Sequence, residues 1–150
     1  MKVGECCNRA VTTIESDADL TTAAHMMRDH HVGFLIVLPP GEAARQPVGV
    51  LTDRDIVLQV LAKSVDPASL TVGDIMTRDP MIAAEEDDLG ELLQGLRLAG
   101  IRRVPVVDSQ GILVGIISVD DAIEVIAGLL ADVSGSIRHQ QRREWRTRRS

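Results

Sequence analysis

The sequence predicts a mixed α/β (α+β) fold made of two copies of one β-α-β-β-α unit. Apolar runs with strand character alternate with segments in which apolar residues recur at helical spacing. The pattern occurs twice: residues 4–38 match 73–107 at a shift of 69, and residues 49–55 match 115–121 at a shift of 66. A half-chain buries little core alone. We therefore expect the two repeats to pack through their sheets around a pseudo-two-fold axis.

The elements follow one order in each repeat. A short strand (11–14; 81–83) precedes a helix opened by Asp17 or Asp87, then a strand (34–38; 104–107), a turn, a second strand and a second helix. The first turn is three residues longer than the second, and turns tolerate insertion. We assign residues 1–66 to repeat 1, 67–133 to repeat 2 and 134–150 to a basic, flexible tail that begins at a Ser-Gly-Ser boundary.

The second strand of each repeat ends in a hydroxyl residue that is followed three residues later by aspartate. Thr52 and Asp55 form the first copy, Ser118 and Asp121 the second. Helix capping explains either copy alone, but two copies at equivalent positions favour a shared binding role. A helix N-terminus attracts phosphate, a carboxylate accepts hydrogen bonds from ribose hydroxyls, and Arg54 offers donors to phosphate. The motif therefore predicts a phosphorylated ligand.

Composition and charge exclude several classes of protein. No apolar run approaches the ~18 residues of a membrane helix, and the first residues lack a signal-peptide core. Cys6 and Cys7 indicate packing in a reducing compartment and not a disulfide framework. We therefore expect a cytoplasmic protein without a membrane partner. The formal net charge of −6 combines +5 over residues 138–149 with −11 over the rest.

Neither catalysis nor metal binding is indicated. The histidines at 25, 30 and 31 have spacings that suit a metal site poorly. No nucleophile lies in sequence beside a base that would activate it. We therefore predict a protein that is not an enzyme, with no catalytic cofactor.

The motifs at 49–55, 73–80, 102–108 and 115–121 resemble those of the tandem CBS-domain pair, or Bateman module, in family order. The resemblance covers residues 1 to about 130. It implies two clefts between the repeats, a regulatory role, and an adenine nucleotide (AMP, ADP or ATP) as regulatory ligand. NAD(H) and S-adenosyl compounds are further ligands in the family.

The resemblance also implies roles for individual residues. Asp55 and Asp121 would hold ribose hydroxyls, and Thr52 and Ser118 would bond ribose or phosphate. The other implied contacts are to phosphate (Arg54, Arg102, Arg103), to the adenine edge through backbone near Thr12, Pro80 and Met81, and to the base through the apolar side chains of Ile36 and Pro105. Asp120 stands where repeat 1 has Arg54, and its negative charge weakens the second site for phosphates. We expect one well-formed site, around Thr52, Arg54 and Asp55.

Two partners are predicted besides the nucleotide, and a third is considered as an alternative. Apolar helix faces within 20–27, 89–98 and 123–130 predict a homodimer, and a regulatory role implies a regulated protein. The alternative is a regulator linked to nucleic acid through the arginine-rich tail, where Trp145 could stack on a base. The acidic body opposes this alternative because it would repel nucleic acid.

Overall fold

The computed structural model describes residues 1–41 and 45–148, and it contains two sheets of mixed topology. In the first sheet β1 pairs parallel with β2, which pairs antiparallel with β3, which pairs antiparallel with β4. In the second, β5 pairs parallel with β6 and β6 antiparallel with β7. The predicted α+β class is confirmed. The strands are β1 (Thr13–Glu15), β2 (Phe34–Leu38), β3 (Gly49–Thr52), β4 (Thr77–Arg78), β5 (Ala83–Ala84), β6 (Arg103–Val107) and β7 (Leu113–Ser118).

Helices α2 (Leu20–His30) and α5 (Leu89–Ala99) begin slightly later than predicted. The N-cap of α2 is Asp19, whose carboxylate accepts from Thr22 N at 2.6 Å. The N-cap of α5 is Asp88, which accepts from two backbone amides at 2.8 and 3.1 Å. Asp87 instead accepts from Ala84 N at 2.8 Å and closes the preceding turn. A cap must reach the amides two and three residues ahead, and this requirement selects the later aspartate.

The apolar faces of α2 and α5 are buried within their own repeats, which corrects part of the dimer prediction. Leu20, Ala23 and Met27 belong to the core of repeat 1, and Leu92 and Leu96 to that of repeat 2. An amphipathic stripe covers one surface, and here that surface is the sheet beneath each helix. A homodimer must therefore use apolar side chains outside these two packed faces, and in the third predicted face Ile123, Ile126 and Leu130 remain exposed.

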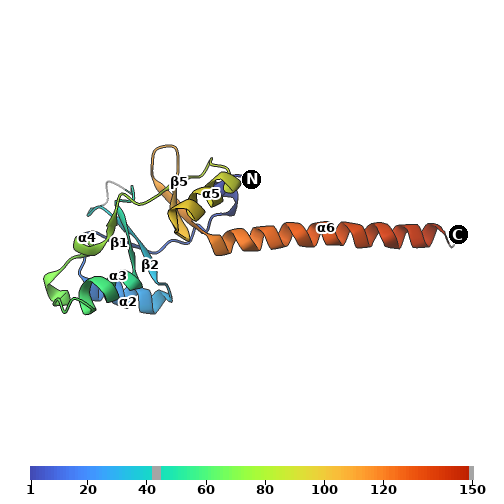
Figure 1. Cartoon of the computed structure of the whole chain (residues 1–150). Coiled ribbons are helices and arrows are strands. Elements are labelled where there is room, and N and C mark those ends of the chain that lie inside the picture. The colour runs from blue at the N-terminus through green and yellow to red at the C-terminus, as the bar shows by residue number, and fades with distance from the viewer. Residues whose placement is uncertain (42–44, 149–150) are drawn as a thin grey trace.

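The two repeats exchange their first helices. Val3 of α1 (Val3–Cys6) is fully buried in the core of repeat 2, and Val72 of α4 (Val72–Ile75) in the core of repeat 1. Backbone bonds fix the exchange: Asn8 and Ile116 pair reciprocally at 2.8 and 2.9 Å, and β4 pairs with β3. Figure 1 shows the N-terminus beside α5. The spatial units therefore differ from the repeats in sequence.

A helix follows the last strand of each repeat, with different geometry. In repeat 1 α3 (Asp53–Ile56) continues as a π-helical turn, η1 (Val57–Leu61), and the 3₁₀ turn η2 (Pro67–Ser69) begins the link. In repeat 2 one helix, α6, runs from Val119 to Thr147. A small apolar cluster of Ile36, Leu38 and Leu113 joins the repeats.

The segment from residue 134, which we expected to form a flexible tail, is helical as far as Thr147. Helix α6 passes through the Ser-Gly-Ser segment without a break, and Figure 1 shows it projecting far from the body. One glycine costs a helix about 1 kcal/mol relative to alanine, and the flanking Leu, Ala, Arg and Gln residues are good helix formers. Residues 42–44 of the predicted turn and Arg149 lie outside the described residues. Over the described ranges, no helix combines the length and apolarity needed to cross a bilayer.

Candidate functional site

A cavity of about 620 Å³ opens where the two repeats meet. Repeat 1 contributes the start of β2, the end of β3 and the first turn of α3, while repeat 2 contributes the segments that precede β5 and β6 and the start of β6. The volume lies within the ~300–1,000 Å³ usual for small-molecule sites. The cavity is lined by Gly33, Phe34, Val50, Thr52, Asp53, Arg54, Asp55, Thr77, Pro80, Met81, Ile101, Arg102, Arg103 and Pro105.

Thr52 and Asp55 form a reciprocal capping box at the wall of this cavity. Asp55 Oδ2 accepts from Thr52 N at 2.9 Å, and Thr52 Oγ1 accepts from Asp55 N at 3.1 Å. Both side chains are partly buried. A carboxylate has about four lone-pair sites, so the cap leaves Asp55 able to accept further hydrogen bonds. The capping interpretation and the binding interpretation are therefore compatible in this structure.

Three arginines line the cavity, and their surroundings differ. The Arg103 guanidinium lies 5.5 Å from the centroid of the Phe34 ring, within cation–π distance. Arg102 Nη2 donates to Asp120 Oδ1 at 3.1 Å, and both side chains of this pair are exposed. Arg54 follows Asp53 in the first turn of α3. With Asp53 and Asp55 as the lining acids, the formal charge of the lining is +1, which suits an anionic ligand.

Apolar side chains form the rest of the lining. Pro105 is buried on β6, Val50 lies two residues before Thr52 on the same face of β3, and Pro80 and Ile101 are half-buried. Met81 is 36% exposed at the cavity wall. An aliphatic surface opposite charged groups can hold a flat base while its sugar and phosphates face the polar side.

The equivalent motif in repeat 2 has a different arrangement. Asp121 Oδ2 accepts from Ser118 N and from Ser118 Oγ, both at 2.7 Å, so the two side chains satisfy each other. Neither residue lines the cavity described above, and neither does Asp120, which is paired with Arg102. The structure thus brings together the predicted residues around Thr52 and Asp55 and separates them from those around Asp121.

Two other predicted residues are also placed away from this cavity. Ile36 is fully buried in the cluster that joins the repeats. The backbone carbonyl of Thr12 accepts from Ile36 N at 3.2 Å. Its acceptor is therefore already engaged within the sheet, whereas the equivalent segment at Pro80 and Met81 lies on the cavity wall.

Sequence reasoning missed several lining residues. Phe34 is the repeat equivalent of Arg103, at the shift of 69, and that correspondence is a signal that they face each other across the pseudo-two-fold. Val50 follows from strand alternation, because it shares a face with Thr52. Gly33 carries the same signal, because it is the repeat equivalent of Arg102. No sequence signal marks Thr77 or Ile101 as part of the site.

The cysteines and histidines form no metal centre within residues 1–41 and 45–148: no group of three or more His, Cys, Asp or Glu side chains is arranged to hold an ion. Burial raises the pKa of the Cys6 and Cys7 thiols above the usual value of 9.0. Both side chains are partly buried against the core of repeat 2. Their placement and protonation agree with the packing role predicted for them.

The fold and cavity define a paired-repeat module with a ligand-sized site between its halves. The CBS-domain family model matches residues 3–62 and 72–128. The chain therefore belongs to the CBS-domain family, and the resemblance found in the sequence is confirmed.

Three solved structures illustrate the likeness. The CBS domain protein PAE2072 from Pyrobaculum aerophilum, complexed with AMP, is 25% identical with a TM-score of 0.72, over 81% of this chain and 89% of that one. The CBS-domain pair of protein MJ0100, in complex with 5′-methylthioadenosine and S-adenosyl-L-methionine, is 25% identical with a TM-score of 0.72, over 85% and 97%. A hexameric CBS-CP12 protein from bloom-forming cyanobacteria is 31% identical with a TM-score of 0.70, over 82% and 69%.

Proposed function

We propose that this chain is a regulatory module that binds an adenine nucleotide of the AMP, ADP or ATP type and signals its occupancy to another protein. One observation carries the proposal. A single cavity gathers a hydroxyl and a carboxylate from repeat 1, arginines from both repeats and an aliphatic wall. Two of the similar CBS proteins were crystallised with adenosine compounds, which supports this ligand class.

Each part of the ligand has a matching group in the cavity. Asp55 accepts from the ribose hydroxyls, and Thr52 bonds ribose or phosphate. Arg54 and Arg103 take the phosphates, because arginine donors bind phosphate oxygens in a fork geometry. The adenine lies against the aliphatic side chains, with its edge toward the backbone at Pro80 and Met81. The proposal contains no catalytic step.

Occupancy is transmitted through the packing of the two repeats. Asp55 belongs to repeat 1 and Arg103 to repeat 2, so a ligand that contacts both favours the arrangement in which they are close. The size of this shift equals the difference in affinity of the ligand for the two arrangements. A regulated protein that contacts both repeats would respond to this change.

Isothermal titration with AMP, ADP, ATP, NADH and S-adenosylmethionine tests the proposal. The variant Asp55→Asn keeps an oxygen that can accept from Thr52 N but loses the charge that holds the ribose. Removing a charged hydrogen-bond partner typically costs about 1.5–3 kcal/mol, so we expect affinity to fall at least about tenfold. Asp121→Asn is the matched control in repeat 2 and should bind nearly as the wild type does. No heat with any of these ligands would mean that both motifs are only caps.

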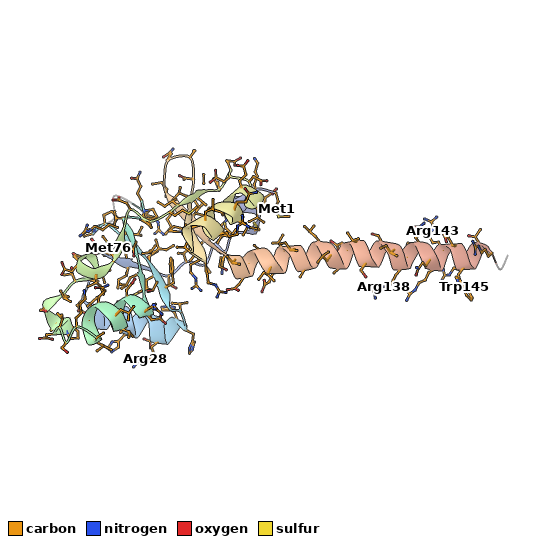
Figure 2. The ribbon with its side chains drawn as sticks, viewed as in Figure 1. Met1, Arg28, Met76, Arg138, Arg143 and Trp145 are labelled. Atoms are coloured by element: carbon orange, nitrogen blue, oxygen red, sulfur yellow. The ribbon has the colours of Figure 1, made fainter. Side chains whose placement is uncertain are left out.

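The alternative function, a regulator that contacts nucleic acid, is favoured by one observation. Arg138, Arg143 and Trp145 project from the far part of α6, well away from the acidic body (Figure 2). A fluorescent RNA or DNA strand titrated at two salt concentrations tests it, because phosphate contacts give a steep salt dependence. Binding that is lost in the double variant Arg142→Glu, Arg143→Glu would support the alternative. If the fluorescence of the strand did not change with either the wild type or the double variant, the alternative would be refuted.

A further inference from the structure

Most of helix α6 makes no packing contact with the described part of the body of the protein. Its 29 residues span about 43 Å, yet Ala122 is its only buried residue among those described. From Ile126 to Thr147 every residue except Ser134 is exposed. Most helical stability in proteins comes from packing of an apolar face and not from propensity. Gly128 and Gly135 lower the intrinsic propensity further. The helix therefore needs a surface that residues 1–41 and 45–148 do not supply.

The exposed part of α6 carries a regular apolar stripe. Its members are separated by three, four, three and four residues, and their exposed fractions lie between 47% and 64%. This spacing is that of the a and d positions of a coiled coil, which bury one seam against a partner helix. The family model ends at residue 128, so most of the stripe lies outside the matched domain. The stripe consists of Ile123, Ile126, Leu130, Val133 and Ile137.

The charge along α6 is divided into two halves of opposite sign. Residues 119–132 contain four acidic residues and no lysine or arginine, a formal charge of −4. Residues 133–148 contain five arginines and Glu144, a formal charge of +4. In a parallel pair of such helices, each half would face a half of the same sign. In an antiparallel pair, every acidic half faces a basic half.

We propose that α6 binds α6 of a second copy of this chain, as an antiparallel two-helix coiled coil closed along the apolar stripe. A second copy fits better than a foreign helix, because α6 alone carries the apolar stripe, an acidic half and a basic half. Two copies of α6 therefore complement each other. The arrangement is isologous, so it closes as a dimer and does not propagate into a filament. Leu130 is the middle member of the stripe and lies near the two-fold axis. The arginine-rich end of each copy then points toward the acidic body of the other.

Sedimentation equilibrium of the full-length protein tests the pairing. Leu130→Lys places a charge in the seam, and Ala131→Lys places the same charge one residue further on, outside the stripe. Both positions are exposed, so neither change disturbs the fold of the body. We expect Leu130→Lys to raise the dissociation constant of the dimer at least about tenfold and Ala131→Lys to leave it within about threefold. A wild-type monomer at tens of micromolar, or a dimer indifferent to Leu130→Lys, would overturn the proposal.

The orientation has its own test. In an antiparallel dimer opposite charges attract, so the dissociation constant rises between about 50 and 500 mM salt; in a parallel dimer it falls. The double variant Glu124→Arg, Asp132→Arg brings the acidic half to a formal charge of zero. This change weakens an antiparallel dimer and strengthens a parallel one, so a stronger dimer would refute the orientation. Neither test involves a nucleotide, so the outcome is independent of ligand binding in the cavity.

Discussion

Replacing Val3 by alanine removes two carbon atoms from a core that is built mainly by the other repeat. Val3 is fully buried and packs in one cluster with Ala83, Leu92 and Val104. Its repeat equivalent, at the shift of 69, is Val72, which is also fully buried but packs in the core of repeat 1. The two valines therefore form a matched pair that reports on the exchange of first helices.

The cost of each substitution follows from its burial. About 0.8 kcal/mol for each buried carbon gives about 1.6 kcal/mol of lost transfer free energy. The cavity that remains adds to this value, so we expect about 2–3 kcal/mol of lost unfolding free energy for either variant. For a chain of 150 residues, each kcal/mol lowers Tm by about 2–4 °C.

Urea denaturation measures the loss of stability, and native-state hydrogen exchange locates it. Local unfolding can expose the backbone amides of one core while the other core stays folded. If the first helices are exchanged, Val3→Ala lowers protection first at amides of β6 and β7, and Val72→Ala first at amides of β2 and β3. The opposite assignment, with Val3→Ala exposing β2 and β3, would refute the exchange. An effect below about 0.5 kcal/mol for both variants would refute the burial argument.

Four further measurements check other parts of the structure. Gly115→Ala should destabilise the protein by about 1–3 kcal/mol in urea denaturation, because the new methyl group would lie 2.9 Å from the Asn8 carbonyl oxygen; a neutral result would contradict this close approach. Gly128→Ala has open space around it and should raise the helical circular dichroism signal, stabilising α6 by about 1 kcal/mol; a loss of helix would argue against it. The amide of Glu91 lowers the pKa of Asp88 below the usual 3.8, so the cap stabilises the fold above that pH and is lost as the pH falls through the folded pKa. The Tm values of wild type and Asp88→Ala should therefore differ at pH 7 and converge below pH 3.8, and a constant difference would be inconsistent with this cap. Burial raises the pKa of the Cys7 thiol above 9.0, so iodoacetamide should react with it more slowly than with a free thiol at neutral pH, and equal rates would show that the site is open.

The local chemistry of the site was predictable because it depends on short spacings. Thr52 and Asp55 are three residues apart, so the capping box and its position at the end of a strand follow from the sequence. The pairing of Arg102 with Asp120 was not predictable, because the two residues are 18 positions apart and meet only when β6 and α6 are in place. The pair directs Arg102, which lines the cavity, toward the motif of Ser118 and Asp121. No local sequence pattern indicates this contact.

The helices show the same division. Periodicity correctly predicts which residues of α2 form its apolar face, but it does not specify the surface that this face covers. We expected Leu20 and Met27 to serve a dimer, and the structure places them in the core. A similar apolar spacing in α6 remains exposed, because this helix leaves the body after its first turns (Figure 1).

By itself the sequence determined the α+β class, the two repeats, the CBS family and the strand-to-helix motif, since periodicity, turn residues and capping act over a few neighbouring positions. The tertiary structure alone decided three things: the exchange of α1 and α4 between cores, the gathering of Arg102 and Arg103 beside Asp55, and the exposure of the α6 stripe. The physical reason is that packing pairs surfaces from distant segments. Several pairings of equivalent repeats satisfy the same local patterns, and only burial over the whole chain selects one of them.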